Sequence, residues 1–184
     1  MTLKEYRKKR RSGGSPEPKG RRRRSRKYPH FVIQHHAAST DHYDFRLEID
    51  GVLASWAIPK GPSTNPKDKR MARRTEDHPM DYEDFEGVIP EGEYGAGRVI
   101  VWDHGTYTNN SDHNMAEALK RGHLSFSLDG EKLHGGYALT RIRKAKDEAW
   151  LLVKRNDEDA DRRRNPLRSR PESVLSGRTL DELS

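Results

Sequence analysis

The chain has 184 residues, enough for one domain with a buried core, but only 31% of them are hydrophobic and 35% are charged. It contains no cysteine, which excludes disulfides and thiolate metal sites, so histidine and carboxylate side chains would have to hold any metal. No apolar run approaches the ~18 residues of a membrane-spanning helix. The basic N-terminus is not followed by the apolar segment of a secretory signal, so we expect a cytoplasmic protein without a membrane partner.

Positive charge is concentrated near the N-terminus. Residues 4–27 contain 13 Lys or Arg and 2 Glu, whereas the whole chain carries a net charge of only +7, so the remainder is acidic overall. Such an arm is typical of proteins that contact a polyanion such as nucleic acid, although a solvated charged tail has the same composition. Glycines and prolines interrupt it, so we expect residues 1–29 to be a basic, largely disordered arm.

Short strands follow the arm in close succession. The predicted elements are a strand at 31–35, a hairpin at 42–58, a strand at 69–77, a turn-rich loop at 85–97 leading into a strand at 99–103, a helix at 115–121 capped by Ser111 or Asp112, and strands at 124–128, 133–143 and 149–155. This pattern favours a single β-barrel or sandwich at residues 30–156, followed by a polar tail at 157–184 that is expected to fray. The motif GEYGAG precedes a strand rather than a helix, so we interpret it as turn geometry and not as a phosphate loop.

The hairpin carries the strongest functional pattern. His42, Asp44 and Arg46 alternate along its first strand and share one face with Glu48, while the residues between them are apolar. Asp50-Gly51 is a two-residue turn signal. Closing the hairpin there pairs Ile49 with Val52, Leu47 with Ala54, Phe45 with Trp56 and Tyr43 with Ile58, and sets the small residues Ser55 and Ala57 opposite Arg46 and Asp44. Mixed charge on a solvated strand face is the ordinary alternative.

Two histidines and one carboxylate form a candidate metal site. His36 follows the first strand and His42 opens the next, so the loop between them could bring both imidazoles to Asp44. Nitrogen and oxygen ligands of this kind suit Mn²⁺, Fe²⁺ or Zn²⁺ rather than Ca²⁺. Consecutive strand residues face opposite ways, so only one of His35 and His36 should be a ligand. A divalent cation beside the Arg46 guanidinium is suited to holding a phosphate.

His78 is a second candidate for phosphate chemistry. It shares parity with Arg70 and Glu76, so all three are expected to line one wall, where His78 could stabilise a transition state or protonate a leaving oxygen. Lys60 and Arg70 are candidate phosphate contacts, although either residue alone is more often a surface charge.

Three motifs make the chain similar to a known family. Residues 31–107 resemble the 3′-phosphoesterase domain of bacterial DNA ligase D and its free-standing archaeal relatives, through the motifs QHHAASTDHYDFRLEIDGVLASWAIPKGPS, TEDHPMDYEDFEGVIPEGEYGAG and VWDHGTY. LKEYRKKR and SPEP in the arm and PESVLSGRTLDEL near the end extend the likeness. The resemblance implies an all-β fold, a single compact β-barrel with one or two short helices and flexible tails. It also implies a cytoplasmic, nucleoid-associated prokaryotic protein, free-standing or a fragment.

The resemblance further implies an activity on DNA 3′ ends. Members of the family remove a 3′-terminal ribonucleoside and a 3′-phosphate, and the resulting 3′-OH serves a ligase or polymerase in double-strand break repair by end joining. The implied metal is Mn²⁺, with Co²⁺ or Zn²⁺ as other candidates, and the implied partners are DNA 3′ ends and possible separate ligase and end-joining factors. The implied site comprises the metal ligands His36, His42 and Asp44, the phosphate-engaging Arg46 and His78, Tyr82, the supporting residues Lys60, Arg70 and Glu76, and Arg10 and Glu17 of the arm.

Two positions depart from the family pattern, and two other functions fit part of the site. His35 stands where the family usually has Lys, and Arg11 stands where an acidic residue is common. His42, Asp44 and His78 also resemble the facial triad of Fe(II) oxygenases, which would use Arg46 to bind a keto-acid carboxylate. A catalytically silent DNA-end adaptor is the third reading, although an adaptor has no need of the His/Asp/Arg set.

Overall fold

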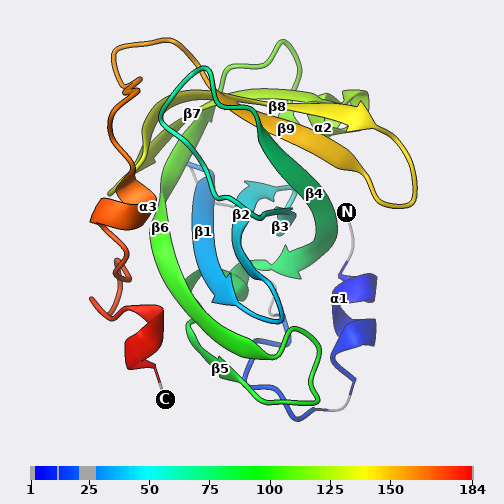
Figure 1. Cartoon of the computed structure of the whole chain (residues 1–184). Coiled ribbons are helices and arrows are strands. Elements are labelled where there is room, and N and C mark those ends of the chain that lie inside the picture. Colours follow the sequence, from blue (N-terminus) through cyan, green and yellow to red (C-terminus); the bar gives the residue numbers. More distant parts are fainter. Residues whose placement is uncertain (1–2, 12, 21–27, 184) are drawn as a thin grey trace.

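A closed antiparallel β-barrel forms the body of the protein (Figure 1). The computed structural model describes residues 3–11, 13–20 and 28–183. The strands in this part of the chain are β1 (His30–Ala37), β2 (Asp41–Ile49), β3 (Val52–Ile58), β4 (Arg70–Pro79), β5 (Gly87–Ile89), β6 (Gly97–Asn109), β7 (His123–Gly130), β8 (His134–Arg143) and β9 (Ala149–Lys154). They pair in the order β1-β2-β3-β4-β9-β8-β7-β6-β5, and pairing of β1 with β6 closes eight of them into a barrel with β5 as an extra strand. The predicted fold class is confirmed.

Short helices and turns accompany the barrel strands. The described residues form three α-helices, α1 (Lys4–Lys9), α2 (Met115–Arg121) and α3 (Pro166–Ser169), and two 3-10 turns, η1 (Met80–Asp84) and η2 (Leu180–Glu182). Helix α2 has the predicted bounds, but its N-cap is Asn114, whose side chain accepts a hydrogen bond from the Glu117 amide, and not Ser111 or Asp112. None of the helices in the described ranges is long and apolar enough to cross a membrane.

Two separate hydrophobic clusters lie on the inner and the outer face of the barrel. The barrel interior is filled by large side chains, among them Phe45, Trp56, Trp102 and Trp150, all fully buried. A second cluster lies between the outer face of the barrel and a covering layer made by α1, η1 and β5, and it contains Tyr6, Val32, Leu53, Met80, Tyr82, Phe85, Ile89, Val99 and Val101. Because the interior is occupied by packed apolar side chains, polar chemistry on these strands has to lie on the outer face.

The β2–β3 hairpin has the register predicted from its apolar pairs. Phe45 pairs with Trp56, Arg46 with Ser55 and Asp44 with Ala57. The turn residues Asp50 and Gly51 have φ angles of +51° and +79°, as a two-residue hairpin turn requires. The turn and the apolar face therefore agree on a single register, which carries His42, Asp44 and Arg46 to the outer face.

Asp103, in the motif VWDHGTY, holds the backbone of a neighbouring turn. Its buried carboxylate accepts hydrogen bonds from the backbone amides of His104, Glu131, Lys132 and Leu133, at 2.9–3.1 Å. These bonds tie β6 to the turn between β7 and β8. The residue is therefore a structural anchor of the barrel.

The described residues of both tails contact the barrel, although flexible tails remain the prediction. In the arm, α1 packs against β4, where the Tyr6 ring is buried and its hydroxyl donates a hydrogen bond to the Pro18 carbonyl. The expected disorder at 21–27 lies outside the described residues. After β9, the chain runs beside β6 (Figure 1). There the Trp102 indole donates to the Arg170 carbonyl at 2.8 Å, and the Val174 amide donates to the Val101 carbonyl at 2.9 Å. These long-range contacts outweigh the polar composition of both segments.

The hairpin turn yields a first prediction. Replacing Gly51 with Ala should lower the free energy of unfolding by about 1 kcal/mol, because an L-residue is strained at positive φ. No atom lies within 4 Å of the added Cβ, so the loss would come from the backbone alone. Urea denaturation of both proteins measures it, and an unchanged midpoint would contradict the turn geometry.

Candidate metal and phosphate site

The three predicted metal ligands converge on the outer face of β1 and β2. His36 pairs directly with His42 across the two strands, and Asp44 lies two residues further along β2. The Asp44 Oδ2 atom is 3.5 Å from His36 Nδ1 and 3.2 Å from His42 Nε2. One ligand atom from each residue lies within 4.8 Å of the other two, a spacing that a single cation could satisfy.

Backbone carbonyls orient both imidazoles toward the carboxylate. His36 Nε2 lies 2.7 Å from the Gly95 carbonyl oxygen, and His42 Nδ1 lies 3.1 Å from that of Thr40. A carbonyl oxygen only accepts, so each of these nitrogens must be a donor, and the other nitrogen of each ring faces Asp44. This is the outer-shell arrangement that metal-binding histidines require, and the nitrogen and oxygen donor set therefore fits a divalent transition metal.

The charges in the cluster favour an ionised carboxylate. Burial alone would raise the pKa of Asp44, but the charge of Arg46 and hydrogen bonds from His36 and His42 hold it well below its usual range. Burial would lower the pKa of His42, yet the hydrogen bond and charge of Asp44 outweigh burial and raise it. A cation bound between Asp44 and His42 would compete with a proton on the ring nitrogen that faces Asp44.

His35 faces away from the cluster, as strand alternation predicts. Its ring stacks on Tyr43 with 4.0 Å between centroids, and its Nε2 lies 2.8 Å from an Asp41 oxygen. The adjacent histidines therefore divide between the two faces, and His36 is the one beside Asp44.

Arg46 is a buried guanidinium held rigidly next to the metal ligands. Its Nε donates to Gln34 at 2.6 Å, and one Nη donates to Ser55 at 2.9 Å. The other Nη is 3.6 Å from Asp44, and the guanidinium lies 5.0 Å from the centre of the Tyr82 ring. Within the described ranges that second Nη makes only this ion pair, so its N–H groups can donate to an anion bound beside Asp44.

Gln34 is a positioning residue that the sequence analysis missed. It is fully buried, and its amide nitrogen donates to the carbonyls of Tyr82 and Phe85 at 2.9 and 3.0 Å. These bonds turn its oxygen toward Arg46 and tie η1 to β1. The available signal was its pairing position opposite Asp44, on the same face of the sheet.

A β-bulge in β4 changes which residues face the site. Ser55 pairs with Thr75, but Leu53 pairs with His78, so β4 contains one residue more than β3 between these pairs. The prediction that Arg70, Glu76 and His78 form one wall by simple alternation is therefore wrong. Before the bulge the outer face carries Arg73 and Thr75, and beyond it the outer face carries His78.

The remaining basic candidates do not join the cluster. Arg70 pairs with Leu152 on the interior-facing parity of β4 and forms an ion pair with Asp68 at 3.5 Å. Lys60 is exposed just after β3, near the end of β2 that carries His42. Arg73, not singled out from the sequence, is exposed on the outer face beside Ala57, which in turn pairs with Asp44.

His78 is enclosed by aromatic rings of the arm and of η1. The centroids of Tyr6 and Tyr82 lie 4.9 and 4.7 Å from that of its imidazole, both edge-on. Burial, followed by the charges of Arg46 and Arg10, holds the pKa of His78 well below its usual range. Its Nδ1 lies 2.9 Å from the Glu76 carbonyl and must donate to it, which leaves Nε2 without a proton.

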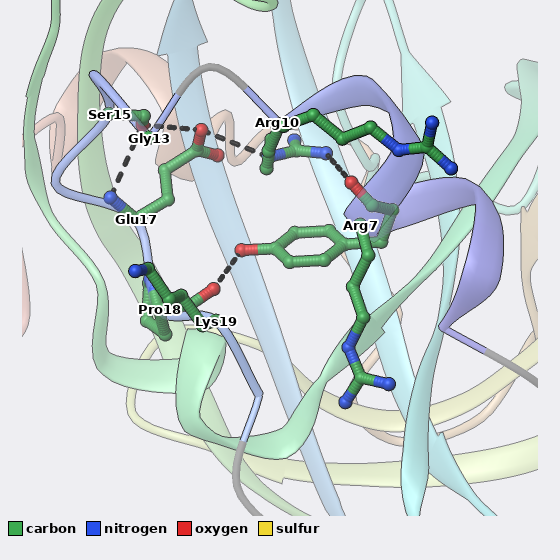
Figure 2. A pocket seen from close by; sticks show the side chains of 9 residues that line it. Arg7, Arg10, Gly13, Ser15, Glu17, Pro18 and Lys19 are labelled. Atoms are coloured by element: carbon green, nitrogen blue, oxygen red, sulfur yellow. Dashed lines mark hydrogen bonds and ion pairs between the residues drawn. The ribbon is translucent and has the colours of Figure 1, made fainter.

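The arm supplies a chain of ionic contacts that reaches the same place. Arg10 pairs with Glu17 at 3.0 Å and with Glu76 at 3.4 Å, and Lys9 also pairs with Glu76 at 3.0 Å. The Tyr82 hydroxyl donates to Glu17 at 2.5 Å, and burial with the Glu17 charge raises the pKa of Tyr82 well above its usual value. Figure 2 shows Arg10 and Glu17 pointing toward one another, and both line a hollow in the arm. The arm residues Arg10 and Glu17 are thus joined to Tyr82, Glu76 and the site.

Fold and geometry together describe a barrel with a candidate metal and phosphate site on its outer face, and comparisons with known proteins give its family. Residues 34–141 match the family described as the DNA Ligase D 3′-phosphoesterase domain. The chain belongs to this family.

Curated relatives are much longer than this chain. It is 52% identical over 183 residues to the Multifunctional non-homologous end joining protein LigD of Pseudomonas aeruginosa, covering 97% of this chain and 22% of that protein. It is 49% identical over 121 residues to the Multifunctional non-homologous end joining DNA repair protein LigD of Mycobacterium tuberculosis, covering 66% of this chain and 15% of the relative. The chain therefore spans about a fifth of these relatives or less.

The ligand geometry predicts metal binding by the intact triad. Asp44→Ala should weaken Mn²⁺ binding at least about 100-fold, because even an outer-shell partner contributes 10–100-fold. The adjacent variant His35→Ala should bind Mn²⁺ like the wild type, because that ring faces the other way. Isothermal titration calorimetry measures both, and equal affinities in all three proteins would remove the assignment.

The buried neutral His78 predicts a pH dependence of stability. The folded protein holds His78 unprotonated, whereas the unfolded chain protonates it at about pH 6.5. Below that pH the unfolded state binds more protons, so the free energy of unfolding contributed by His78 falls, by up to about 2 kcal/mol between pH 7 and pH 5. Urea denaturation at both pH values should show a smaller fall for His78→Gln than for the wild type. Equal falls would mean that His78 is charged in the folded state.

Proposed function

We propose that this protein is a metal-dependent phosphoesterase that heals DNA 3′ ends. It removes a 3′-terminal ribonucleoside by diester cleavage and a 3′-phosphate by monoester cleavage, and leaves a 3′-OH for end joining. The observation that carries the proposal is the approach of His36, His42 and Asp44 to within 4.8 Å of one another beside the buried Arg46. Membership of the phosphoesterase family supports the same reading.

The three ligands would hold Mn²⁺, or Co²⁺ or Zn²⁺, all of which accept nitrogen and oxygen donors. Such a cation supplies Lewis-acid activation of a phosphate oxygen and of water. Arg46 binds the scissile phosphate and neutralises charge that develops on it, and its bonds to Gln34 and Ser55 keep the guanidinium in place throughout.

His78 acts beside Arg46, whose charge is close enough to lower its pKa further after burial has lowered it. Because its Nδ1 donates to the Glu76 carbonyl, a neutral His78 offers only an acceptor at Nε2. It therefore first accepts a hydrogen bond or a proton, from the attacking water or from a protonated phosphate oxygen. The resulting imidazolium then stabilises the negative charge that develops on the phosphate or, where the proton came from a phosphate oxygen, donates it to the leaving oxygen. Tyr82, held protonated beside Glu17, orients this side of the site together with Arg10 and Glu76.

Exposed cations next to the site would contact the bound DNA strand. Lys60 and Arg73 flank the strip of small side chains beside Asp44 and would contact neighbouring phosphates. Arg70 stays a weaker candidate for the same role because it is paired with Asp68. A separate ligase and end-joining factors are proposed partners, in keeping with the names of the relatives, and a nucleoid-associated cytoplasmic location stays a prediction.

The arrangement disfavours an Fe(II) oxygenase. Its triad would need His78 as the third ligand, yet among the described residues the group able to hold a metal is completed by His36, and His78 contacts Tyr6 and Tyr82. A DNA-end adaptor without activity is the remaining alternative, and turnover separates it from an enzyme.

A labelled primer–template ending in one ribonucleotide tests the function. With Mn²⁺, the wild type should shorten the primer by the terminal ribonucleoside and then remove the remaining 3′-phosphate. Asp44→Ala and Arg46→Ala should lose at least about 100-fold in rate, the scale expected when a transition-state contact is removed. His35→Ala is the matched control. Binding of the DNA without any product would support the adaptor, and oxygen uptake with Fe²⁺ and 2-oxoglutarate would support the oxygenase.

A further inference from the structure

Tyr94 is an aromatic side chain at the rim of the site that the chemistry above does not use. It remains 47% exposed, in the loop between β5 and β6. The next residue, Gly95, adopts a φ of +76° and supplies the carbonyl that orients His36. The Tyr94 ring is therefore only one residue away from the backbone group that holds a metal ligand in place.

The other side of Tyr94 contacts the arm. Lys9 donates to its hydroxyl at 3.1 Å, and the Lys9 ammonium lies 4.6 Å from the ring centre. The Arg10 guanidinium lies 5.3 Å from the same centre. Both cations also pair with Glu76, which precedes His78 by two residues. The loop and the arm thus meet at a half-exposed aromatic ring flanked by positive charge.

An exposed ring beside cations matches the chemistry of a nucleotide. Aromatic side chains stack on nucleobases without regard to sequence, because every base has a π face, and neighbouring cations serve the phosphates. The geometry points to Tyr94 as a stacking subsite for the base of the 3′-terminal nucleotide, whose phosphate lies at Arg46. This inference rests on the proposed function and assigns the place of the terminal nucleoside. The competing role for Tyr94 is to hold the arm, with no contact to DNA.

A cycle of two enzymes and two substrates separates these roles. One primer–template ends in a ribonucleotide, and the other ends in an abasic ribose that is otherwise identical. Tyr94→Ala should lower kcat/KM about 5- to 150-fold on the first, the range given by stacking of one base, mainly through KM. It should have little effect on the second, because that substrate has no base to stack. Tyr94→Phe keeps the ring and should retain the preference for the base.

Two controls make the cycle decisive. Tyr28→Ala removes another exposed tyrosine, located just before β1 at the end opposite His36, and should leave both rates unchanged. Equilibrium binding of the same two oligonucleotides without metal, followed by fluorescence anisotropy, reports the subsite independently of turnover. There the wild type should prefer the base-bearing end and Tyr94→Ala should not.

The outcomes distinguish failure of the Tyr94 subsite from failure of the proposed function. Equal losses of Tyr94→Ala on both substrates would assign Tyr94 to the arm and overturn the inference, and so would the absence of any loss. If the wild type cleaved neither substrate, the proposed function would fail, and the binding preference alone would then decide whether the subsite exists.

Discussion

The pairing register of β1, β2 and β3 is the constraint on which the site depends. A slip of one residue would turn Asp44 and Arg46 into the barrel and expose Phe45 on the outer face. Phe45 and Trp56 are fully buried, so that slip would lose much of the hydrophobic energy that closes the barrel. The same apolar burial that stabilises the fold therefore places His36, His42 and Asp44 together. These three side chains do not have to supply the energy that brings them together.

Burial of the Arg46 charge is the main electrostatic cost of this arrangement. Only 3% of the residue is exposed, and a charge removed from water must be compensated by partners. Asp44, Gln34 and Ser55 provide that compensation through two hydrogen bonds and one close opposite charge. The charge of Arg46 lowers the pKa of Asp44, and it adds to burial in lowering the pKa of His78, so one guanidinium acts on a candidate ligand and on a candidate proton carrier.

Local pattern predicted an all-β barrel or sandwich, the hairpin and the approach of the three candidate metal ligands, because alternation and the Asp50-Gly51 turn are properties of neighbouring residues. The prediction failed where one extra residue in a strand shifts the alternation of its side chains. The bulge before His78 reverses the alternation of side chains in β4, and no residue type in that segment predicts a bulge. Gln34 and the docked arm also escaped prediction. Their partners lie far away in the chain, 48 residues for the bond from Gln34 to Tyr82 and 67 for the bond from Lys9 to Glu76, and composition records only the charge of the arm.

The site lies on the outside of a closed barrel, so the stability of the barrel and the stability of the layer that encloses the site can differ. The barrel has a continuous ring of hydrogen bonds and a filled interior, whereas His78 and Tyr82 are enclosed by a short helix, Tyr6 and a few ion pairs. The enclosing layer can open at a free energy well below that of global unfolding. Heating should accordingly inactivate the protein before it melts, with amide hydrogens of α1 exchanging early while those of β2 and β3 stay protected.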